Sequence, residues 1–239
     1  MGKLWQDLQG NIAFVLVCGC IIVALSLLAH FTERFLKEKR RISTAKRVSI
    51  VGICAGIAAV LHILDFPLMF LAPSFYKLDF SELPVLLCGF YIGPSATIAC
   101  EGVKILLKLL LKGTSTAFVG DFANFAVGCS LVLPATIIYH IRKSRGIALL
   151  GMAIGTAFLT VFGSAFNAIY LLPKFAQLYG MPLDTIVAMG SAICSSVSNV
   201  FTFVLFCVAP LNLIKGVTVS LLTLLLYKRI ERICFPKGV

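Results

Sequence analysis

Charged residues are scarce in this chain, and acidic residues are scarcer still. Of 239 residues only 13% are charged, and 21 lysines and arginines outnumber 10 aspartates and glutamates. Hydrophobic residues make up 59% of the chain, and the mean hydropathy is +1.00. A soluble domain of this length does not need so much apolar surface, which excludes that class. The apolar runs are long enough for membrane-spanning helices rather than barrel strands, so the composition predicts an all-α integral membrane protein.

The sequence also lacks the motifs of an enzyme or a metalloprotein. It contains no Walker sequence, no nucleophile elbow and no specific pair of catalytic carboxylates. Its nine cysteines include no Cys-x-x-Cys motif, and most fall in apolar segments as small side chains suited to burial. His30, His62 and His140 are scattered near the ends of predicted helices. We therefore expect no catalytic residue, no metal site and no resident cofactor.

The basic residues are concentrated at helix ends. Seven lie in residues 34–47, three in residues 142–145 and four in residues 228–237. This is the positive-inside pattern of membrane proteins, which sets orientation and gives no indication of a nucleic-acid partner. The pattern predicts a multi-pass protein of the plasma membrane, with the N-terminus outside and the C-terminus in the cytoplasm.

Residues 11–31 form the first predicted spanning helix. Its apolar core is longer than that of a signal peptide, and a basic segment follows it instead of a small-residue cleavage site, so we expect the helix to remain. The later predicted helices are residues 48–64, 82–91, 95–111, 122–139, 147–172 and 210–227. The predicted domains are an N-terminal helix with a basic cytoplasmic linker (1–47), a six-helix membrane domain (48–232) and a cytoplasmic tail (233–239).

Residues 174–209 allow two interpretations. Residues 174–184 have the composition of a loop, and the apolar stretch 185–209 is long enough to span the membrane. However, an extra crossing would leave too few residues for a reversal before the last helix, and it would move the last basic cluster to the opposite side. We therefore predict a short outer helix that leads into the last helix, with a kink at Pro210.

The last predicted helix carries Asn212 and Lys215 inside an apolar run, about one helical turn apart. An ammonium group at membrane depth costs roughly 2.5–3.5 kcal/mol on insertion scales, so it usually faces a partner, a cavity or an interface. One explanation is a lysine that snorkels to the membrane surface from near a helix end. The other is that Asn212 and Lys215 form one wall of a polar site.

Other polar residues map to the same outer half of the predicted bundle, although they come from different segments. They are Asp79, Glu82, Asn124, Asn167 and Tyr170. Amides, carboxylates, a phenol and one lysine suit a neutral, flat, hydrogen-bonding ligand with a polyol tail. The outer loop at 65–81 is unusually apolar, and Met69, Leu78 and its aromatic side chains suit stacking on a ring. The alternative is a membrane enzyme or adaptor in which these polar residues merely pack.

Two pairs of residues share a helix face. Glu101 and Lys104 are spaced to form an ion pair within the segment 95–111. Ala55 and Ala59 lie on one face of the segment 48–64, and such small-residue faces let another helix approach closely in lipid. That other helix could belong to this chain or to a partner, and the sequence favours neither.

Five motifs, taken together and in order, resemble the riboflavin-specific S components of energy-coupling-factor (ECF) vitamin transporters. They are KLDFSELPVLLCGFYIGP, GDFANFAVG, NAIYLLPKF, YGMPL followed by IVAMG, and APLNLIKG followed by LLYKR. The resemblance covers about residues 47–232, so residues 11–46 lie outside it. Asp121 stands where the family commonly has glutamate. The resemblance implies a six-helix S-component core, to which the first predicted helix is an addition.

The resemblance also implies a function and partners. Family members are plasma-membrane proteins that bind riboflavin at the outer side, and we expect this chain to come from a Gram-positive bacterium. They dock onto a T subunit with two ABC ATPases, which hydrolyse ATP, and transport is thought to involve toppling of the S component in the bilayer. Asn212 and Lys215 match the motif that contacts the flavin ring, and Asn167 is placed to do the same. Ala55 and Ala59 match the face that contacts the T subunit.

FMN or another vitamin is the alternative ligand within the same fold. A phosphate would favour additional cations near the outer mouth of the site, and Lys77, Lys112 or Lys174 could supply one. The choice between riboflavin and FMN therefore stays open at this point.

Overall fold

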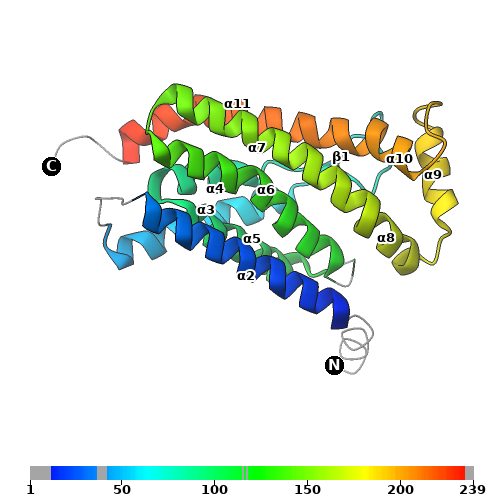
Figure 1. Ribbon diagram of the computed structural model, residues 1–239, viewed down its shortest axis with the longest axis horizontal. Coiled ribbons are helices and arrows are strands. Elements are labelled where there is room, and N and C mark those ends of the chain that lie inside the picture. Colours follow the sequence, from blue (N-terminus) through cyan, green and yellow to red (C-terminus); the bar gives the residue numbers. More distant parts are fainter. Residues whose placement is uncertain (1–11, 37–41, 115, 117, 235–239) are drawn as a thin grey trace.

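The computed structural model describes residues 12–36, 42–114, 116 and 118–234, with side chains described for residues 17–36, 42–114, 116, 118–178 and 180–227. Its backbone is a bundle of long helices, with short helices at one end (Figure 1). Within the described residues, five helical segments are long and apolar enough to cross a membrane: Val17–Phe35, Thr44–Ile63, Val119–Ile141, Arg145–Leu178 and Val200–Tyr227. The predicted all-α membrane fold is confirmed.

The elements follow the chain in a simple order. They are α2 (Ile12–Phe35), α3 (Thr44–Ile63), β1 (Phe66–Pro67), β2 (Lys77–Leu78), α4 (Glu82–Ile92), α5 (Pro94–Lys112), α6 (Val119–Ile141), α7 (Arg145–Phe166), α8 (Leu172–Tyr179), α9 (Leu183–Ser191), α10 (Val200–Phe203) and α11 (Ala209–Cys234). β1 and β2 pair antiparallel and hold the base of the loop after α3. Single π-helical turns at Asn167–Leu171 and Val204–Val208 join α7 to α8 and α10 to α11.

The N-terminal helix α2 packs along α5 and α6, on the outside of the bundle (Figure 1). Ala29 is fully buried in that contact, in one apolar cluster with Ile98 and Cys129. An ion pair of 3.3 Å between Glu33 and Arg47 connects the end of α2 to the start of α3. The division of the chain into domains at residue 47 stays a prediction.

The predicted loop at residues 174–184 is wrong in its first part. After α7 the chain makes a π turn and continues as α8 to Tyr179, where Gly180 ends the helix in the left-handed conformation (φ 62°). Pro173 lies in the first turn of α8, where a missing N–H is tolerated. The proline therefore begins a new helical segment instead of ending the previous one.

Residues 185–209 do not form an additional crossing, which confirms the prediction of a short helix that leads into the last helix. α9 is short, no regular helix is assigned between Ala192 and Asn199, and α10, its π turn and α11 then form one helical segment. The side chain of Asn199 accepts a hydrogen bond from the Thr202 N–H, and Thr202 bonds back to the Asn199 N–H. The π turn ends just before Pro210, a residue that cannot donate to the helical ladder, so the irregularity occurs where the kink was predicted.

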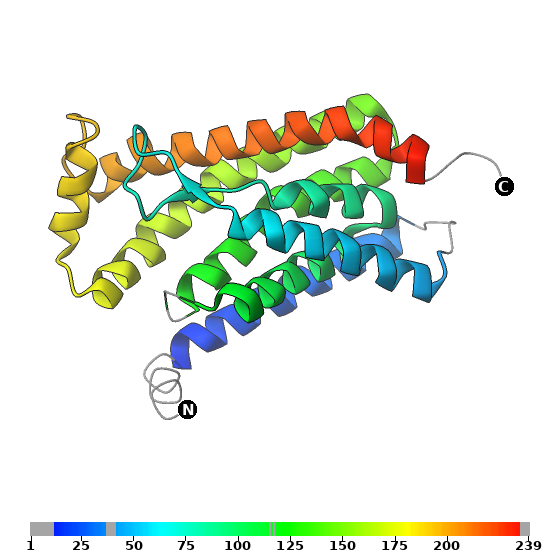
Figure 2. The ribbon, with the colours of Figure 1, turned by 180° about the vertical axis from the view of Figure 1, so that it is seen from behind.

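α7 lies between α6 and α11 and contacts both over much of its length (Figures 1 and 2). Gly155 of α7 faces the α6 backbone, because a Cβ there would meet the carbonyl oxygen of Leu131 at 2.3 Å. Small residues thus permit an approach that larger side chains would prevent. Leu131, Met152 and Leu159 are buried in the apolar core on this side.

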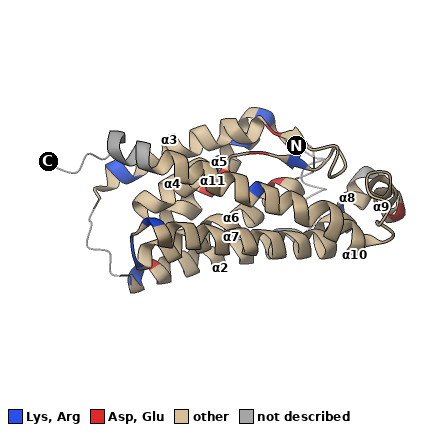
Figure 3. Ribbon diagram, turned by 90° about the horizontal axis from the view of Figure 1, so that it is seen from above, with Lys and Arg blue, Asp and Glu red and all other residues tan. Residues whose placement is uncertain are grey.

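The two ends of the bundle differ in charge and structure. The end of α2 and the starts of α3 and α7 carry Arg34, Arg47 and Arg145 at one end (Figure 3). The β1–β2 hairpin, α8 and α9 lie at the other end (Figures 1 and 2). Met1 and the side chains of the basic cluster at 228–237 lie outside the described parts of the chain.

Candidate ligand-binding site

A cavity of about 270 Å³ lies at the hairpin end of the bundle. This volume is near the lower limit of about 300 Å³ that is common for small-molecule sites. Its walls come from α3, the β1–β2 hairpin, α5, α6, the π turn after α7, α8 and the start of α11. The lining residues are His62, Asp65, Phe75, Tyr76, Lys77, Asp79, Lys108, Thr116, Gly120, Asp121, Ala123, Asn124, Val127, Asn167, Leu171, Phe175, Val208, Leu211, Asn212 and Lys215.

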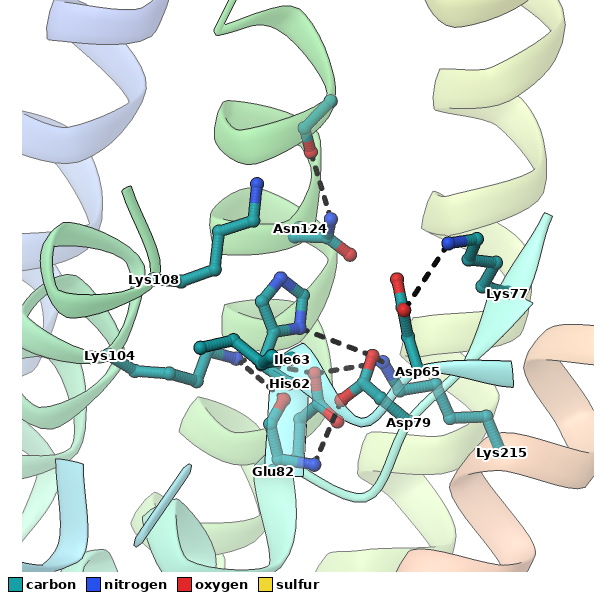
Figure 4. Close-up of polar contacts among 12 residues, drawn as sticks. His62, Ile63, Asp65, Lys77, Asp79, Glu82, Lys104, Lys108, Asn124 and Lys215 are labelled. Atoms are coloured by element: carbon teal, nitrogen blue, oxygen red, sulfur yellow. Dashed lines mark hydrogen bonds and ion pairs between the residues drawn. The ribbon is translucent and has the colours of Figure 1, made fainter. Parts of the chain in front are cut away.

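Lys215 reaches this cavity from α11, and two carboxylates hold it. Its Nζ lies 3.1 Å from Oδ2 of Asp79 and 3.0 Å from Oε1 of Glu82 (Figure 4). All three side chains are buried. An ammonium group has three N–H donors, so two contacts leave one for a ligand. The snorkelling explanation, which requires an ammonium group in water, is wrong for Lys215.

Behind Lys215, the carboxylate of Glu82 also contacts a second buried ammonium group. Nζ of Lys104 lies 3.5 Å from Oε1 of Glu82 and 3.1 Å from Oγ of Ser81, and it pairs with Glu101 (Figure 4). The predicted Glu101–Lys104 pair is thus confirmed. Both residues have no exposed surface, and neither lines the cavity. Lys104 and Lys215 therefore share one carboxylate between the protein interior and the cavity.

His62, at the end of α3, lies on the other side of Asp79. Its Nδ1 is 3.4 Å from Oδ2 of Asp79, while Oδ1 of Asp79 accepts a hydrogen bond of 2.9 Å from the Ser81 N–H. Asp79, Glu82 and Glu101 thus form one buried group with Lys104 and Lys215, which contains three acidic and two basic side chains. No cluster suited to a metal ion occurs among the described residues, and here lysines occupy the spaces between the carboxylates.

Asp79 lies in the loop between β2 and α4, and it stays ionised at neutral pH. Burial alone would raise the pKa of its carboxyl group. The Lys215 ammonium and the His62 imidazole outweigh burial and hold that pKa well below its ordinary value. The Asp79–Lys215 ion pair is therefore intact across the physiological pH range.

Amide side chains line another part of the cavity. Asn167, in the π turn, donates to the Gly163 carbonyl at 2.7 Å and accepts a hydrogen bond of 2.8 Å from the Tyr76 hydroxyl. Asn212 is buried, and its Nδ2 has no hydrogen-bond partner among the described residues. A Cβ at Gly163 would lie 2.7 Å from this Nδ2, so α7 allows the amide no room to move. An unpaired buried donor costs about 1–3 kcal/mol, which a ligand acceptor would recover.

Asp121 and Lys108 form a further ion pair at the cavity, with Nζ 2.5 Å from Oδ1. The second carboxylate oxygen of Asp121 is buried without a hydrogen-bond partner in the described structure. On the next turn of α6, Asn124 donates to the Gly120 carbonyl at 3.0 Å (Figure 4). This part of the wall therefore offers an unpaired acceptor, where the Asn212 part offers an unpaired donor.

At the rim, two lysines share one carboxylate. Nζ of Lys77 lies 3.3 Å from Oδ1 of Asp65, and Nζ of Lys112 lies 3.1 Å from the same oxygen. Both lysine side chains are 41% exposed. This group carries one positive charge in excess. Lys174, the third lysine considered for a phosphate, contacts Gln177 and does not line the cavity.

An aromatic group completes the cavity wall. The Phe75 ring lies 4.7 Å from that of Tyr76, and it meets Phe175 of α8 edge-on at 6.3 Å between centroids. Phe75 and Tyr76 belong to the apolar loop whose aromatic residues were expected at the site. Phe175 was not expected there, because it falls in the segment predicted as loop.

The structure brings most of the predicted ligand contacts together. The cavity is lined by Asp79, Asn124, Asn167, Asn212 and Lys215, and Glu82 contacts Lys215 from behind. Leu78 is buried away from the cavity because side chains alternate along a strand and its neighbour Lys77 is the one that lines the cavity rim. Met69 is 66% exposed in the loop, and Tyr170 stacks on Phe166 instead. These three residues do not line the cavity.

Four titratable lining residues had no predicted contact with a ligand: His62, Asp65, Lys108 and Asp121. A lone histidine near a helix end has no distinguishing spacing, so no pattern indicated His62. Lys108 lies one turn beyond Lys104, and that spacing alone suggested only that one of the two reaches water. Asp121 did have a signal, because it stands where the resembled family commonly has glutamate.

Ala55 and Ala59, predicted to contact a T subunit, are buried in the chain itself. Their exposed fractions are 0% and 1%, and Ala55 belongs to the main apolar core. Both methyl groups therefore pack inside this chain, and their contact with a T subunit stays a prediction. The small residues of α3 that face outward are Gly52 and Gly56, where an added Cβ would meet no atom within 4 Å.

Comparisons with known proteins match most of the chain. The family profile "ECF transporter, substrate-specific component" matches residues 46–227. The riboflavin transporter RibU of Staphylococcus aureus (strain TCH60) is 34% identical over 194 residues, which cover 81% of this chain and 95% of the relative. The riboflavin transporter FmnP of Bacillus subtilis (strain 168) is 28% identical over 188 residues, covering 78% and 92%.

A solved structure agrees with these relatives. It is described as "Structure and mechanism of the S component of a bacterial ECF transporter", and it superimposes with a TM-score of 0.63 at 34% identity. The similarity covers 81% of this chain and 99% of that chain. α2 precedes the residues that the family profile matches. The bundle, the cavity and the extent of these matches lead to one conclusion: this chain belongs to the family of substrate-specific components, or S components, of ECF transporters.

Proposed function

We propose that this chain is the riboflavin-binding subunit of an ECF-type ABC transporter. The relatives in S. aureus and B. subtilis are named riboflavin transporters, and the chain covers more than nine tenths of each. The observation that carries the proposal is the cavity, which joins an aromatic wall to buried polar atoms without partners. Those atoms are Nδ2 of Asn212 and Oδ2 of Asp121.

Riboflavin has three parts that such a cavity recognises separately. The polar edge of its ring has carbonyl acceptors, which suit the Asn212 amide and the remaining N–H of Lys215. The flat faces of the ring suit the aromatic group around Phe75. The hydroxyls of the ribityl chain suit the unpaired oxygen of Asp121 and the side chain of Asn124. One ligand thereby removes the cost of several unpaired groups at once.

The charges inside the cavity favour a neutral ligand over a phosphorylated one. Lys108 and Lys215 are each paired with a buried carboxylate, so a phosphate would compete with an existing ion pair. FMN is the second candidate, because Lys77 and Lys112 share only Asp65 at the exposed rim. A phosphate at the end of the ribityl chain could form an ion pair with one of these two lysines.

Titration of the purified protein with riboflavin tests the proposal, because flavin emission is quenched on binding. We expect quenching that saturates at submicromolar ligand, and an absence of quenching by riboflavin and by FMN would refute a flavin site. The double variant Lys77→Gln/Lys112→Gln decides between the two ligands. It should leave riboflavin affinity unchanged, and it should weaken FMN binding only if the rim holds the phosphate.

The cavity is proposed to open on the outer side of the membrane, with the C-terminus in the cytoplasm and the N-terminus outside. The positive-inside rule supports this, because the arginines at the starts of α3 and α7 lie at the end of the bundle opposite the cavity. A cysteine introduced at Thr116, in a cysteine-free background, should react with an impermeant maleimide in intact cells. A cysteine at Lys143 should react only after permeabilisation, and the reverse pattern would invert the topology.

Delivery inward is proposed to require docking on a T subunit and two ATPases, followed by toppling of this chain in the bilayer. Family membership supports these partners, and the outward face of α3 offers a docking surface at Gly52 and Gly56. Gly56→Trp should leave riboflavin binding intact and abolish ATP-dependent uptake with the partner subunits. Ala55→Trp should instead disrupt the fold because that position is fully buried. Normal uptake by Gly56→Trp would show that this face of α3 is not the docking surface.

A further inference from the structure

Behind the cavity lies a chain of alternating buried charges. Glu101 pairs with Lys104, Lys104 lies 3.5 Å from Glu82, Glu82 lies 3.0 Å from Lys215, and Lys215 lies 3.1 Å from Asp79. Only Asp79 and Lys215 line the cavity. The other three members are at most 1% exposed, and they come from α4 and α5. Figure 4 shows two of them, Glu82 and Lys104, beside Lys215.

The neighbouring helix α6 has a glycine at the place where these carboxylates pack, and any side chain there would displace them. Gly128 of α6 faces them, and a Cβ at that position would lie 2.2 Å from Oε1 of Glu101 and 3.4 Å from Oε1 of Glu82. The three donors of Lys104 are all directed to acceptors, namely Ser81, Glu82 and Glu101. The place of the Glu82 carboxylate is therefore set by Lys104 and by α6.

Stability alone does not explain this arrangement. A buried ion network is often no more stable than well-packed apolar residues of the same volume, because each charge loses its hydration. Here one oxygen of Glu82 and one of Glu101 also lack a hydrogen-bond partner among the described residues, which adds to the cost. What the network does achieve is a single position for Oε1 of Glu82, the oxygen that contacts Lys215.

We propose that Lys104 and Glu101 are positioning residues for ligand binding. They hold the Glu82 carboxylate, and Glu82 together with Asp79 directs the remaining N–H of Lys215 into the cavity. Without Lys104, the uncompensated carboxylates of Glu82 and Glu101 draw the Lys215 ammonium inward and away from the ligand. This inference rests on the proposed function, because its readout is the affinity for riboflavin.

A charge-balance series provides the test. Lys104→Met should weaken riboflavin binding roughly tenfold, within the range found for residues that act through a network. The double variant Lys104→Met/Glu101→Gln removes one charge of each sign and should recover most of that affinity. A purely structural role predicts the opposite order, with the double variant at least as impaired as Lys104→Met. Thr97→Val, which alters a buried polar contact far from the cavity, serves as the control and should bind normally.

A double-mutant cycle with Lys215→Met tests whether Lys104 influences riboflavin affinity through Lys215. If Lys104 acts through Lys215, adding Lys104→Met to Lys215→Met should cause little further loss of affinity, whereas additive losses would overturn the proposal. Thermal unfolding of each variant identifies those that do not fold, and Glu101→Gln, nearly isosteric, then replaces Lys104→Met in the cycle. Unmodified protein that binds no riboflavin would refute the proposed function and this inference with it. Normal binding combined with additive losses would refute only the positioning role.

Discussion

Buried polar side chains in the half of the bundle away from the cavity differ sharply from those in the half that contains the cavity. In the half away from the cavity, Thr97 donates to the Gly93 carbonyl at 3.0 Å, and Thr136 donates to the Val132 carbonyl at 2.7 Å. His140 bonds the Gly89 carbonyl at 2.9 Å. These groups bond to nearby backbone, as polar side chains in a membrane helix usually do.

The half of the bundle that contains the cavity keeps buried polar atoms without hydrogen-bond partners in the described structure. They are Nδ1 of His62, Oε2 of Glu82, Oε2 of Glu101, Oδ2 of Asp121, Oγ of Ser164 and Nδ2 of Asn212. Three of these atoms belong to residues that line the cavity, namely His62, Asp121 and Asn212. Buried polar groups in proteins are nearly always paired, so these exceptions need an explanation. The proposed function supplies one, because a bound ligand would pair atoms that the protein alone leaves unpaired.

Removal of the Lys215 charge should cause the largest loss of folding stability and of riboflavin affinity. Lys215→Met leaves Asp79 and Glu82 as buried carboxylates without their shared ammonium, so we expect a loss of about 3–5 kcal/mol of folding stability and a large but still measurable fall in riboflavin affinity. Thermal unfolding without ligand measures the first effect, and flavin fluorescence measures the second. Lys112→Met, at the exposed rim, is the matched control and should cost at most about 1 kcal/mol. Equal losses from both variants would contradict the burial argument.

Asn212→Leu separates stability from binding. The change removes an unpaired amide, so the unliganded protein should be as stable as the native one or more stable. Riboflavin affinity should nevertheless fall by about 1–3 kcal/mol because a hydrogen-bond donor to the ring is lost. Unfolding of the ligand-free variant and titration with riboflavin give the two values. A variant that is destabilised and still binds normally would show that Asn212 has a structural role alone.

Gly163→Ala tests the same amide from the neighbouring helix. An added methyl group would lie 2.7 Å from Nδ2 of Asn212 and must displace it, so riboflavin affinity should fall roughly tenfold. Gly146→Ala on the same helix is the control, since its methyl group meets no atom within 4 Å. Titration of both variants measures the difference. Equal affinities would mean that the position of Asn212 does not limit binding.

The smallest effect should come from a change in the half of the bundle away from the cavity. Thr97→Val removes a satisfied hydroxyl, and we expect a loss of about 0.5–1.5 kcal/mol in stability. Riboflavin affinity should not change, because Thr97 lies far from the cavity and contacts only Gly93 and Thr136 among the hydrogen bonds described for it. A clear loss of affinity would show that the two halves are coupled through the core.

The apolar runs in the sequence predicted the fold well, because each membrane helix is recognisable from the length and hydropathy of its own segment. α3, α4, α5 and α6 fall close to their predicted ranges, and the short outer helix before α11 is also present. The error after α7 occurs where local rules leave a choice, because Pro173 can end a helix or begin one. Local rules also leave open whether Ala55 and Ala59 face a partner or the core, and in the structure both are buried.

The site was predictable in part for a similar reason. A lysine or an amide in an apolar helix is anomalous by itself, which identified Asn212, Lys215 and Asn167 without any neighbours. His62 and Asp121 are ordinary residues at helix ends, and only their convergence on the cavity distinguishes them. Side-chain direction decided the remaining cases, as with Leu78, whose alternation along β2 turns it away from the ligand space.

Composition and periodicity alone determined that this chain lies in a membrane, that it is helical, and that its polar residues gather in one half. Those properties depend on the transfer of apolar runs into lipid, which each segment settles independently. The tertiary structure alone decided which charged side chains form ion pairs with one another. Glu82 lies between Lys104 and Lys215 because α4, α5 and α11 converge there, and Gly128 of α6 leaves the space. Ion pairing acts over a few ångströms, so it depends on contacts between helices that no single segment specifies.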